Sequence, residues 1–182
     1  HDRMMPAPLA AEELRGVDFL FSTHAHSDHL DPEAVAKILR ANPSCRLVLP
    51  AAAVETATAR GADAARILAM QAFEKFTLDA LEVEMLPSAH ERLENNAEGE
   101  TLFAGFVLGI GGKRVYHSGD CVPFDGLAAL LAERHIDVAF LPVNGRDAYR
   151  SGNGIAGNFS IDEAASLCVE AGIACLVPHH FG

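Results

Sequence analysis

Residues 22–31 concentrate the side chains most capable of chemistry in this sequence. Three histidines and an aspartate fall within six positions, in the pattern His24-x-His26-x-Asp28-His29. Neutral imidazole nitrogens and carboxylate oxygens are ligands that suit zinc, manganese and iron. A solvated polar loop is the simpler alternative, but imidazoles crowded this closely are unfavourable without a shared ion. The spacing therefore predicts a metal site.

The segments on either side of this loop are expected to hold it rigidly. The apolar run 17–21 predicts a strand buried on both faces. On the other side, Asp31 is a good helix N-cap, Pro32 suits the first helical position and Glu33 favours the first turn. A short loop between a strand and a helix can keep several donor groups in fixed positions.

Further candidate ligands follow other predicted strands. His90 comes after the run 81–86, Asp120 after 113–117, and the pair His179 and His180 after 174–177. Such polar residues avoid burial unless they are paired or bind a metal. Taken singly, His90 could belong to a polar surface turn and Asp120 could be a cap or turn residue. Their order along the chain, together with the first loop, favours one shared site.

This set of motifs resembles the signature of the metallo-β-lactamase superfamily of dinuclear metal hydrolases. The resemblance implies a mixed α/β (α+β) fold, the αββα four-layer sandwich, as one hydrolase domain over residues 1–182. It also implies two divalent metal ions, with zinc or manganese favoured over iron. The implied ligands are His24, His26 and His90 for one ion, and Asp28, His29 and His180 for the other, with Asp120 bridging both. His180 is preferred to His179 because the family motif places its ligand two residues after the proline.

One branch of the superfamily is especially similar. Residues 115–120, 5–9 and 177–180 resemble L-ascorbate-6-phosphate lactonase and its relatives. The departure is His90, which stands where that branch has an Asp-rich segment, so the ligand set is nearer to the general superfamily. The resemblance implies that a metal-bridging hydroxide opens a small lactone or ester, which could be phosphorylated, with Asp28, His29 and Asp120 as catalytic residues.

The Gly- and Asn-rich segment 144–159 is expected to form a wall for an anionic small-molecule substrate. Loops of this length are commonly functional. Its candidate substrate residues are Arg146, Tyr149 and Asn158, with Asn144 and Arg150 nearby. Arg146 is the best anchor because a planar guanidinium suits phosphate or carboxylate. A glycine-rich surface loop, or one that joins copies of the chain in a homo-oligomer, is the equally weighted alternative.

Other functions on the same scaffold stay open. A metal-dependent phosphodiesterase is the nearest alternative. Diiron flavoproteins share the scaffold but usually carry Glu at the second ligand position, where this chain has His26. A non-catalytic metal-binding protein is the alternative from a different class.

Composition narrows the partners and the compartment. The 182 residues carry a formal charge of −11 and no Lys/Arg cluster, so a nucleic-acid partner is not expected. No apolar run is long enough to predict a membrane span. Four cysteines without a C-x-x-C pair indicate reduced thiols and a cytoplasmic protein. Because the chain starts at His1 and stops at Gly182, directly after a ligand cluster, we expect it to be incomplete at both ends.

The spacing of apolar residues and the positions of capping and turn residues predict the remaining helices and strands. Ser160 and Glu163 form an expected capping box for the last helix. His117 is expected in a sheet or beside the ligands, and Cys121 as a packed thiol. Helices are expected at 9–15, 32–41, 51–60, 127–134 and 161–171, and strands at 17–21, 46–50, 67–70, 73–78, 81–86, 102–110, 113–117, 136–141 and 174–177.

Overall fold

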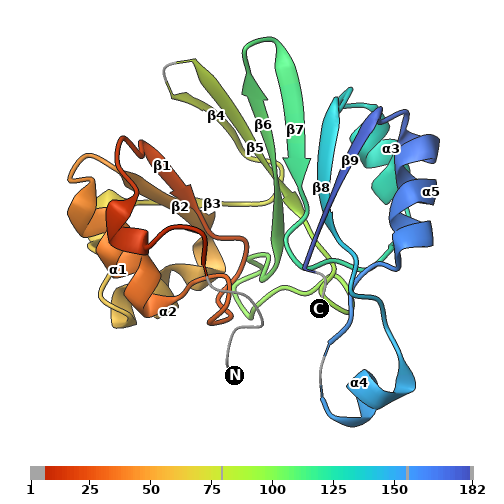
Figure 1. Ribbon diagram of the computed structural model, residues 1–182, viewed down its shortest axis with the longest axis horizontal. Coiled ribbons are helices and arrows are strands. Elements are labelled where there is room, and N and C mark those ends of the chain that lie inside the picture. Colours follow the sequence, from red (N-terminus) through yellow and green to blue (C-terminus); the bar gives the residue numbers. More distant parts are fainter. Residues whose placement is uncertain (1–6, 79, 155, 181–182) are drawn as a thin grey trace.

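Two β-sheets pack face to face in the middle of the molecule, with helices on the outer face of each (Figure 1). This computed structural model describes residues 7–78, 80–154 and 156–180. The layers follow the order α1 and α2, first sheet, second sheet, then α3 and α5 (Figure 1). The predicted four-layer arrangement is confirmed. The helices are α1 (Pro32–Ala41), α2 (Val54–Ala59), α3 (Leu127–Ala132), α4 (Ala148–Gly152) and α5 (Ile161–Ala171).

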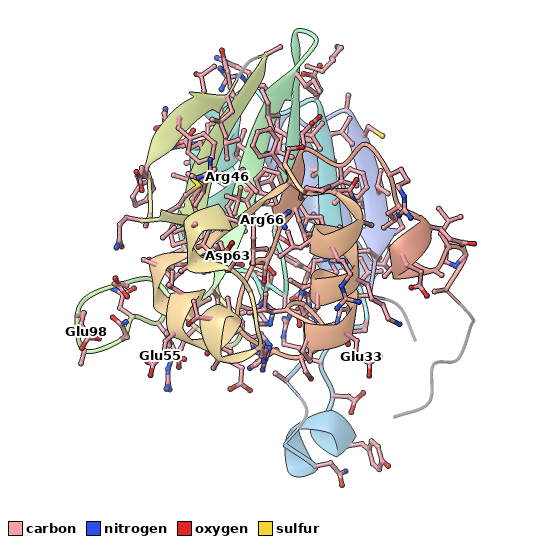
Figure 2. All side chains as sticks on the ribbon, turned by 90° about the vertical axis from the view of Figure 1, so that its left-hand side faces the viewer. Glu33, Arg46, Glu55, Asp63, Arg66 and Glu98 are labelled. Atoms are coloured by element: carbon pink, nitrogen blue, oxygen red, sulfur yellow. The ribbon has the colours of Figure 1, made fainter. Side chains whose placement is uncertain are left out.

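The first sheet contains three parallel strands in the order β1-β2-β3, which are Phe19–Phe21, Arg46–Pro50 and Ile67–Met70. Its helical connections are those expected of parallel strands. Arg66, labelled in Figure 2, stabilises the connection between α1 and β2. Its guanidinium donates hydrogen bonds to the backbone oxygens of Leu39 (2.9 Å), Asn42 (2.6 Å) and Cys45 (2.9 Å). The end of α1 is thereby joined to the start of β2.

The second sheet has six strands in sequence order, β4 to β9. The first four pair antiparallel, and β8 and β9 then add in parallel. Gly111 and Gly112, both with positive φ, form the tight turn between β6 and β7. The strands are β4 (Lys75–Leu78), β5 (Leu81–Pro87), β6 (Ala104–Ile110), β7 (Lys113–His117), β8 (Val138–Pro142) and β9 (Cys175–His179).

Side-chain alternation along the strands divides the core into three apolar layers. In β2, Val48 faces the second sheet, whereas Leu47 and Leu49 face α1 and α2. In β6, Phe106 joins the layer between the sheets, whereas Val107 packs under α3 and α5. Period-two patterning thus lets each central strand serve two layers at once.

Several boundaries differ from the sequence prediction. Residues 17–21 were expected to be buried on both faces, but all three residues of β1 are only half-buried, because β1 lies at an edge of its sheet. The helix expected at 9–15 is one 3-10 turn, Ala11–Glu13. The predicted strand 73–78 starts only at Lys75, because Phe73 adopts φ 67° in a turn. None of the helices within the described residues has the length and apolar character to span a bilayer.

The two best-capped helices match their predicted ranges. Asp31 Oδ1 accepts from the Ala34 amide at 2.6 Å and starts α1. At the start of α5, the Ser160 hydroxyl accepts from the Glu163 amide and the Glu163 carboxylate accepts from the Ser160 amide, which confirms the capping box. Strong N-terminal caps therefore determine where the helices begin that follow the loops 22–31 and 144–159.

Candidate metal centre

The loop after β1 is fastened to both sheets. The Ser22 amide donates to the Val48 oxygen of β2 at 2.9 Å, and the Thr23 oxygen accepts from the Ala104 amide at the start of β6, also at 2.9 Å. Leu30, only 1% exposed, anchors the far end of the loop in the core. The loop therefore bridges the two sheets and offers little freedom to its histidines.

The structure brings all seven predicted ligands together at this loop. Their donor atoms form two groups, and within each group the atoms lie within 4.8 Å of one another. The first group is His24, His26 and His90, and the second group is Asp28, His29, Asp120 and His180. The residues thus fall into the groups that the family resemblance implies, although His24 and His180 are 156 positions apart in the sequence.

Asp120 lies between the two groups and faces both. Its Oδ2 is 3.5 Å from His90 Nε2, whereas its Oδ1 is 3.3 Å from His29 Nε2 and 3.4 Å from His180 Nε2. The Asp120 side chain is 7% exposed, and Oδ1 has no hydrogen-bond partner among the described residues. A buried carboxylate directed at two clusters of imidazole nitrogens is suited to a bridging role.

The neighbouring histidines at the end of β9 take different positions. His180 has φ 53°, a left-handed conformation that is uncommon for a residue other than glycine. It contributes to the second group, whereas the His179 ring lies 4.6 Å from the ring of His117. The turn in the backbone thus separates the two side chains, and His180 is the one beside Asp120.

The electrostatics of the first group favour neutral imidazole. Burial, reinforced by the neighbouring His29, lowers the pKa of His24 from 6.5 to about 2. Burial and the nearby His90 also lower the pKa of His26. A metal-binding nitrogen must be unprotonated, so these histidines need lose no proton to bind an ion.

The second group carries charge. For His29, burial opposes the charged form, but the hydrogen bond and charge of Asp120 outweigh it and raise its pKa. For Asp120, burial is likewise outweighed, by hydrogen bonds from His29 and His90, and its pKa falls well below its usual range. Without a cation, His29 and Asp120 therefore stabilise each other as an ion pair.

The donor set is of the kind that could hold divalent metal ions. Three imidazoles form one cluster, and two imidazoles with a carboxylate form the other, with a second carboxylate between them. Nitrogen and oxygen donors of this kind suit zinc, manganese and iron alike, so the residues do not select one metal by type. Asp120 Oδ1 is buried and makes no well-aligned hydrogen bond among the described residues, although His29 and His180 lie 3.3 and 3.4 Å away, so a cation between these atoms would satisfy it.

A cavity of about 350 Å³ opens beside the first group. Phe103 forms part of its wall and stacks on His90 with ring centroids 4.8 Å apart. The sequence analysis did not single out Phe103, because an aromatic residue before a strand looks like an ordinary core residue. The cavity is lined by His26, His90, Glu91, Glu94, Phe103, Gly154 and Ala156.

The long loop 144–159 reaches this cavity through Gly154 and Ala156, not through its candidate substrate residues. Arg146 donates to the Asn158 oxygen at 2.7 Å and pairs with Glu163 at the start of α5. Tyr149, on α4, is 77% exposed. The side chain of Arg150 lies outside the part of the chain described here.

Asn158 has a position that does not suit substrate contact. It is 2% exposed, and its Oδ1 accepts from the Cys121 amide at 2.7 Å. Since Cys121 follows Asp120, Asn158 helps to hold the segment that carries the shared carboxylate. Cys121 is itself buried, as expected of a packed thiol, and burial raises its pKa to about 11.

Two stacked sheets with a cluster of histidines and aspartates at their shared edge define the class of metal-binding α/β sandwich proteins. The sequence model of the beta-lactamase superfamily domain matches residues 1–181, and the chain belongs to this family. Among curated relatives, a UPF0173 metal-dependent hydrolase from Aeropyrum pernix is 31% identical over 97% of this chain and 70% of its own length. Another, from Opitutus terrae, is 32% identical over 74% of this chain and 57% of its own length.

Solved structures show the same fold. A metallo hydrolase from Ignicoccus hospitalis matches with a TM-score of 0.69 and 22% identity, covering 91% of this chain and 64% of its own. A metallo-beta-lactamase fold protein from Bacillus subtilis matches with a TM-score of 0.68 and 18% identity, covering 96% and 67%. The chain spans little more than half the length of several curated relatives, 57% in one case and 58% in two others.

Proposed function

We propose that this protein is a metal-dependent hydrolase whose two ligand groups hold two divalent cations and whose substrate is a small lactone or ester. The observation that carries the proposal is Asp120, with one carboxylate oxygen facing each ligand group. The description of the curated relatives as metal-dependent hydrolases supports the reaction class. The lactone or ester, in some cases phosphorylated, follows from the motifs at residues 115–120 and 177–180.

Two bound divalent cations would supply Lewis acidity and lower the pKa of a water between them. The first group and the second group would each hold one, with Asp120 contacting both. Asp120 would also fix the separation of the two groups, because its ends are held by the Ser88 hydroxyl on its backbone oxygen (3.1 Å) and by the surrounding imidazoles.

Asp28 is the residue best placed to handle a proton. Its side chain is 63% exposed, and Oδ2 lies 3.6 Å from His29 Nε2 and 3.7 Å from His180 Nε2. It is thus the ligand-group member with both solvent access and contact to the inner side chains. We assign it the transfer of a proton between the reaction site and solvent.

The cavity beside His26 and His90 would receive the substrate. Phe103 offers a flat apolar surface, and Gly154 and Ala156 of the long loop also line the wall. A cavity of about 350 Å³ has the size of a small-molecule site. We also propose that the substrate is anionic and that the protein acts in the cytoplasm.

The test is a metal analysis joined to a substrate screen. Purified protein is analysed for zinc, manganese and iron, then assayed before and after chelation with a neutral lactone, a phosphorylated lactone and bis(p-nitrophenyl) phosphate. The proposal predicts about two equivalents of metal and lactone hydrolysis that chelation abolishes and metal restores. Cleavage of the phosphodiester alone would establish the phosphodiesterase alternative, and metal without any hydrolysis would favour a binding protein.

A further inference from the structure

One hydroxyl group contacts a histidine from each ligand group. Thr23 Oγ1 lies 3.0 Å from His24 Nδ1 and 3.2 Å from His29 Nδ1. Thr23 is 6% exposed and lies outside both sets of donor atoms. The histidine rings themselves are 4.2 Å apart between centroids. Thr23 is therefore a residue outside the donor sets that contacts both groups.

The geometry of the rings shows which nitrogens remain for an ion. His29 Nε2 faces Asp120 at 3.3 Å, and His24 Nε2 lies 3.0 Å from His26 Nδ1, inside the first group. In both His24 and His29, Nδ1 is turned away from the donor cluster and towards Thr23. A neutral imidazole that binds through Nε2 carries its proton on Nδ1, and that proton needs an acceptor.

A threonine hydroxyl has two acceptor lone pairs, enough for both Nδ1–H groups. Histidine ligands almost always give their second N–H to such an outer partner, which orients the ring and fixes the tautomer. Ordinarily each ligand has its own partner. Here a single oxygen serves one ligand of each group.

The fold holds this hydroxyl tightly in place. The Thr23 backbone oxygen accepts from the Ala104 amide of β6, and the preceding residue is bonded to β2. Gly119 packs against the side chain, since a Cβ at that position would lie 2.7 Å from Thr23 Cβ and 2.8 Å from Oγ1. The backbone of Thr23 is thus held by both sheets, and Gly119 packs closely against its side chain.

We propose that Thr23 is a positioning residue that accepts hydrogen bonds from Nδ1 of His24 and of His29 and so couples the two metal-binding groups. This inference rests on the proposed function, because it assumes that both histidines bind a metal through Nε2. Its consequence is that removal of one hydroxyl weakens metal binding in both groups at once.

The experiment compares Thr23→Val, which removes the hydroxyl at nearly constant volume, with Thr23→Ser, which keeps it. Thr58→Val is the matched control, since the Thr58 hydroxyl bonds to Val54 within α2, outside the site. Zinc affinity and stoichiometry are measured by competition with a chromophoric chelator. Thr23→Val should weaken zinc binding at both sites by about 10- to 100-fold, the usual effect of losing an outer partner. Thr23→Ser should recover most of that loss, and Thr58→Val should behave as wild type.

A second measurement does not depend on the variants folding. Long-range proton–nitrogen NMR correlations of the zinc-loaded wild type report which ring nitrogen of each histidine carries the proton. The inference predicts protonated Nδ1 in His24 and in His29. An unprotonated Nδ1 in either ring overturns it, as does wild-type affinity in Thr23→Val or equal losses in the Val and Ser variants. A wild type that binds no metal would overturn the proposed function as well, and so the two failures are distinguishable.

Discussion

The two ligand groups differ in the type of their donor atoms and in their electrostatics. The first group consists of imidazoles alone and is the more buried at two of its three members, with His24 1% exposed and the side chain of His90 at 13%, whereas His26 is exposed at the mouth of the cavity. The second group contains both aspartates and opens to solvent, with side-chain exposures of 63% at Asp28 and 34% at His180. Burial keeps the first group neutral, whereas charge pairing dominates the second.

This difference suggests a division of labour. A set of neutral imidazoles held in part by burial is preorganised for an ion and changes little between the free and bound states. An open set with carboxylates can exchange protons and ligands with solvent. We infer that the first group provides the more permanent position and the second group the reactive one. The following experiments would break or sharpen that contrast, from the largest expected effect to the smallest.

Asp120→Asn should affect both groups together, because one Asp120 oxygen faces each. We expect hydrolysis to fall by about 10²–10³-fold, the size seen when one central electrostatic contributor is removed. Steady-state kinetics of the metal-loaded variant measures the effect, with Asp125→Asn in an exposed turn as the control. Loss of a single ion with activity retained would show that Asp120 belongs to one group and does not bridge.

His24→Ala and His180→Ala should separate the two positions. Removing His24 takes away the buried ligand of the first group, and because solvent has little access to that position, the metal content should fall from about two equivalents to about one. Removing the half-exposed His180 leaves Asp28, His29 and Asp120, so the second ion should return when excess zinc is added. Elemental analysis at two zinc concentrations distinguishes them, with His135→Asn as the control. Equal behaviour of the two variants would contradict the contrast.

The metal-free protein should lose stability as the pH falls below about 6.5. Burial lowers the pKa of His24 to about 2 and that of His179 to about 4, so the unfolded chain binds these protons first. The raised pKa of His29 acts with the opposite sign: its contribution is full below the unfolded value of 6.5 and disappears as the pH rises through the folded value. Asp120 contributes above its ordinary pKa and loses that contribution only in stronger acid.

Because four histidines have a lowered pKa (His24, His26, His117 and His179) and only His29 has a raised one among the described residues, we expect a net loss of at least about 1 kcal/mol between pH 7 and pH 5. Urea unfolding of chelator-treated protein at both pH values measures it. His24→Gln should make the profile flatter. A free energy of unfolding that is constant or higher at pH 5 would mean that the first group is not held neutral by burial.

Gly119→Ala should disturb the contact that joins the groups. Gly119 has φ 64°, and a methyl group there would lie 2.7 Å from Thr23 Cβ. Backbone strain and overlap together should cost about 2–4 kcal/mol. Gly111→Ala has a similar φ of 58° but open space around it, so it reports strain alone, about 1 kcal/mol. Thermal unfolding of both variants measures the difference, and equal shifts would remove the steric part of the explanation.

Arg146→Ala should have the smallest effect. Its contacts with Asn158 and Glu163 brace the loop whose Gly154 and Ala156 line the cavity. We expect KM to rise about two- to fivefold for neutral and anionic substrates alike, comparable with the loss of an exposed ion pair. Arg40→Ala on α1 is the control. A rise confined to anionic substrates would restore Arg146 as the anchor that the sequence analysis expected.

Local chemistry explains what could be predicted in advance. The His24–Asp31 loop was recognised because its ligands are adjacent in sequence and its neighbours carry strong strand and cap signals. α1 and α5 were predicted within their observed ranges because Asp31 and Ser160 bond to amides only three residues away. The substrate wall was less predictable. Whether Arg146 faces a cavity or Glu163 depends on the position of α5 in the fold. The residues near Arg146 in the sequence do not determine that position.

The motifs, through their resemblance to the metallo-β-lactamase superfamily, predicted the fold class, the seven candidate ligands and their division into two groups. Only the tertiary structure shows that one oxygen of Asp120 faces each group and that Thr23 contacts one histidine of each. It also shows that Phe103 lines the cavity. These facts arise because segments as far apart as His24 and His180, 156 positions, meet at the edge of two sheets. Distances set by packing across the core are not present in local sequence, because they depend on every strand register between the residues concerned.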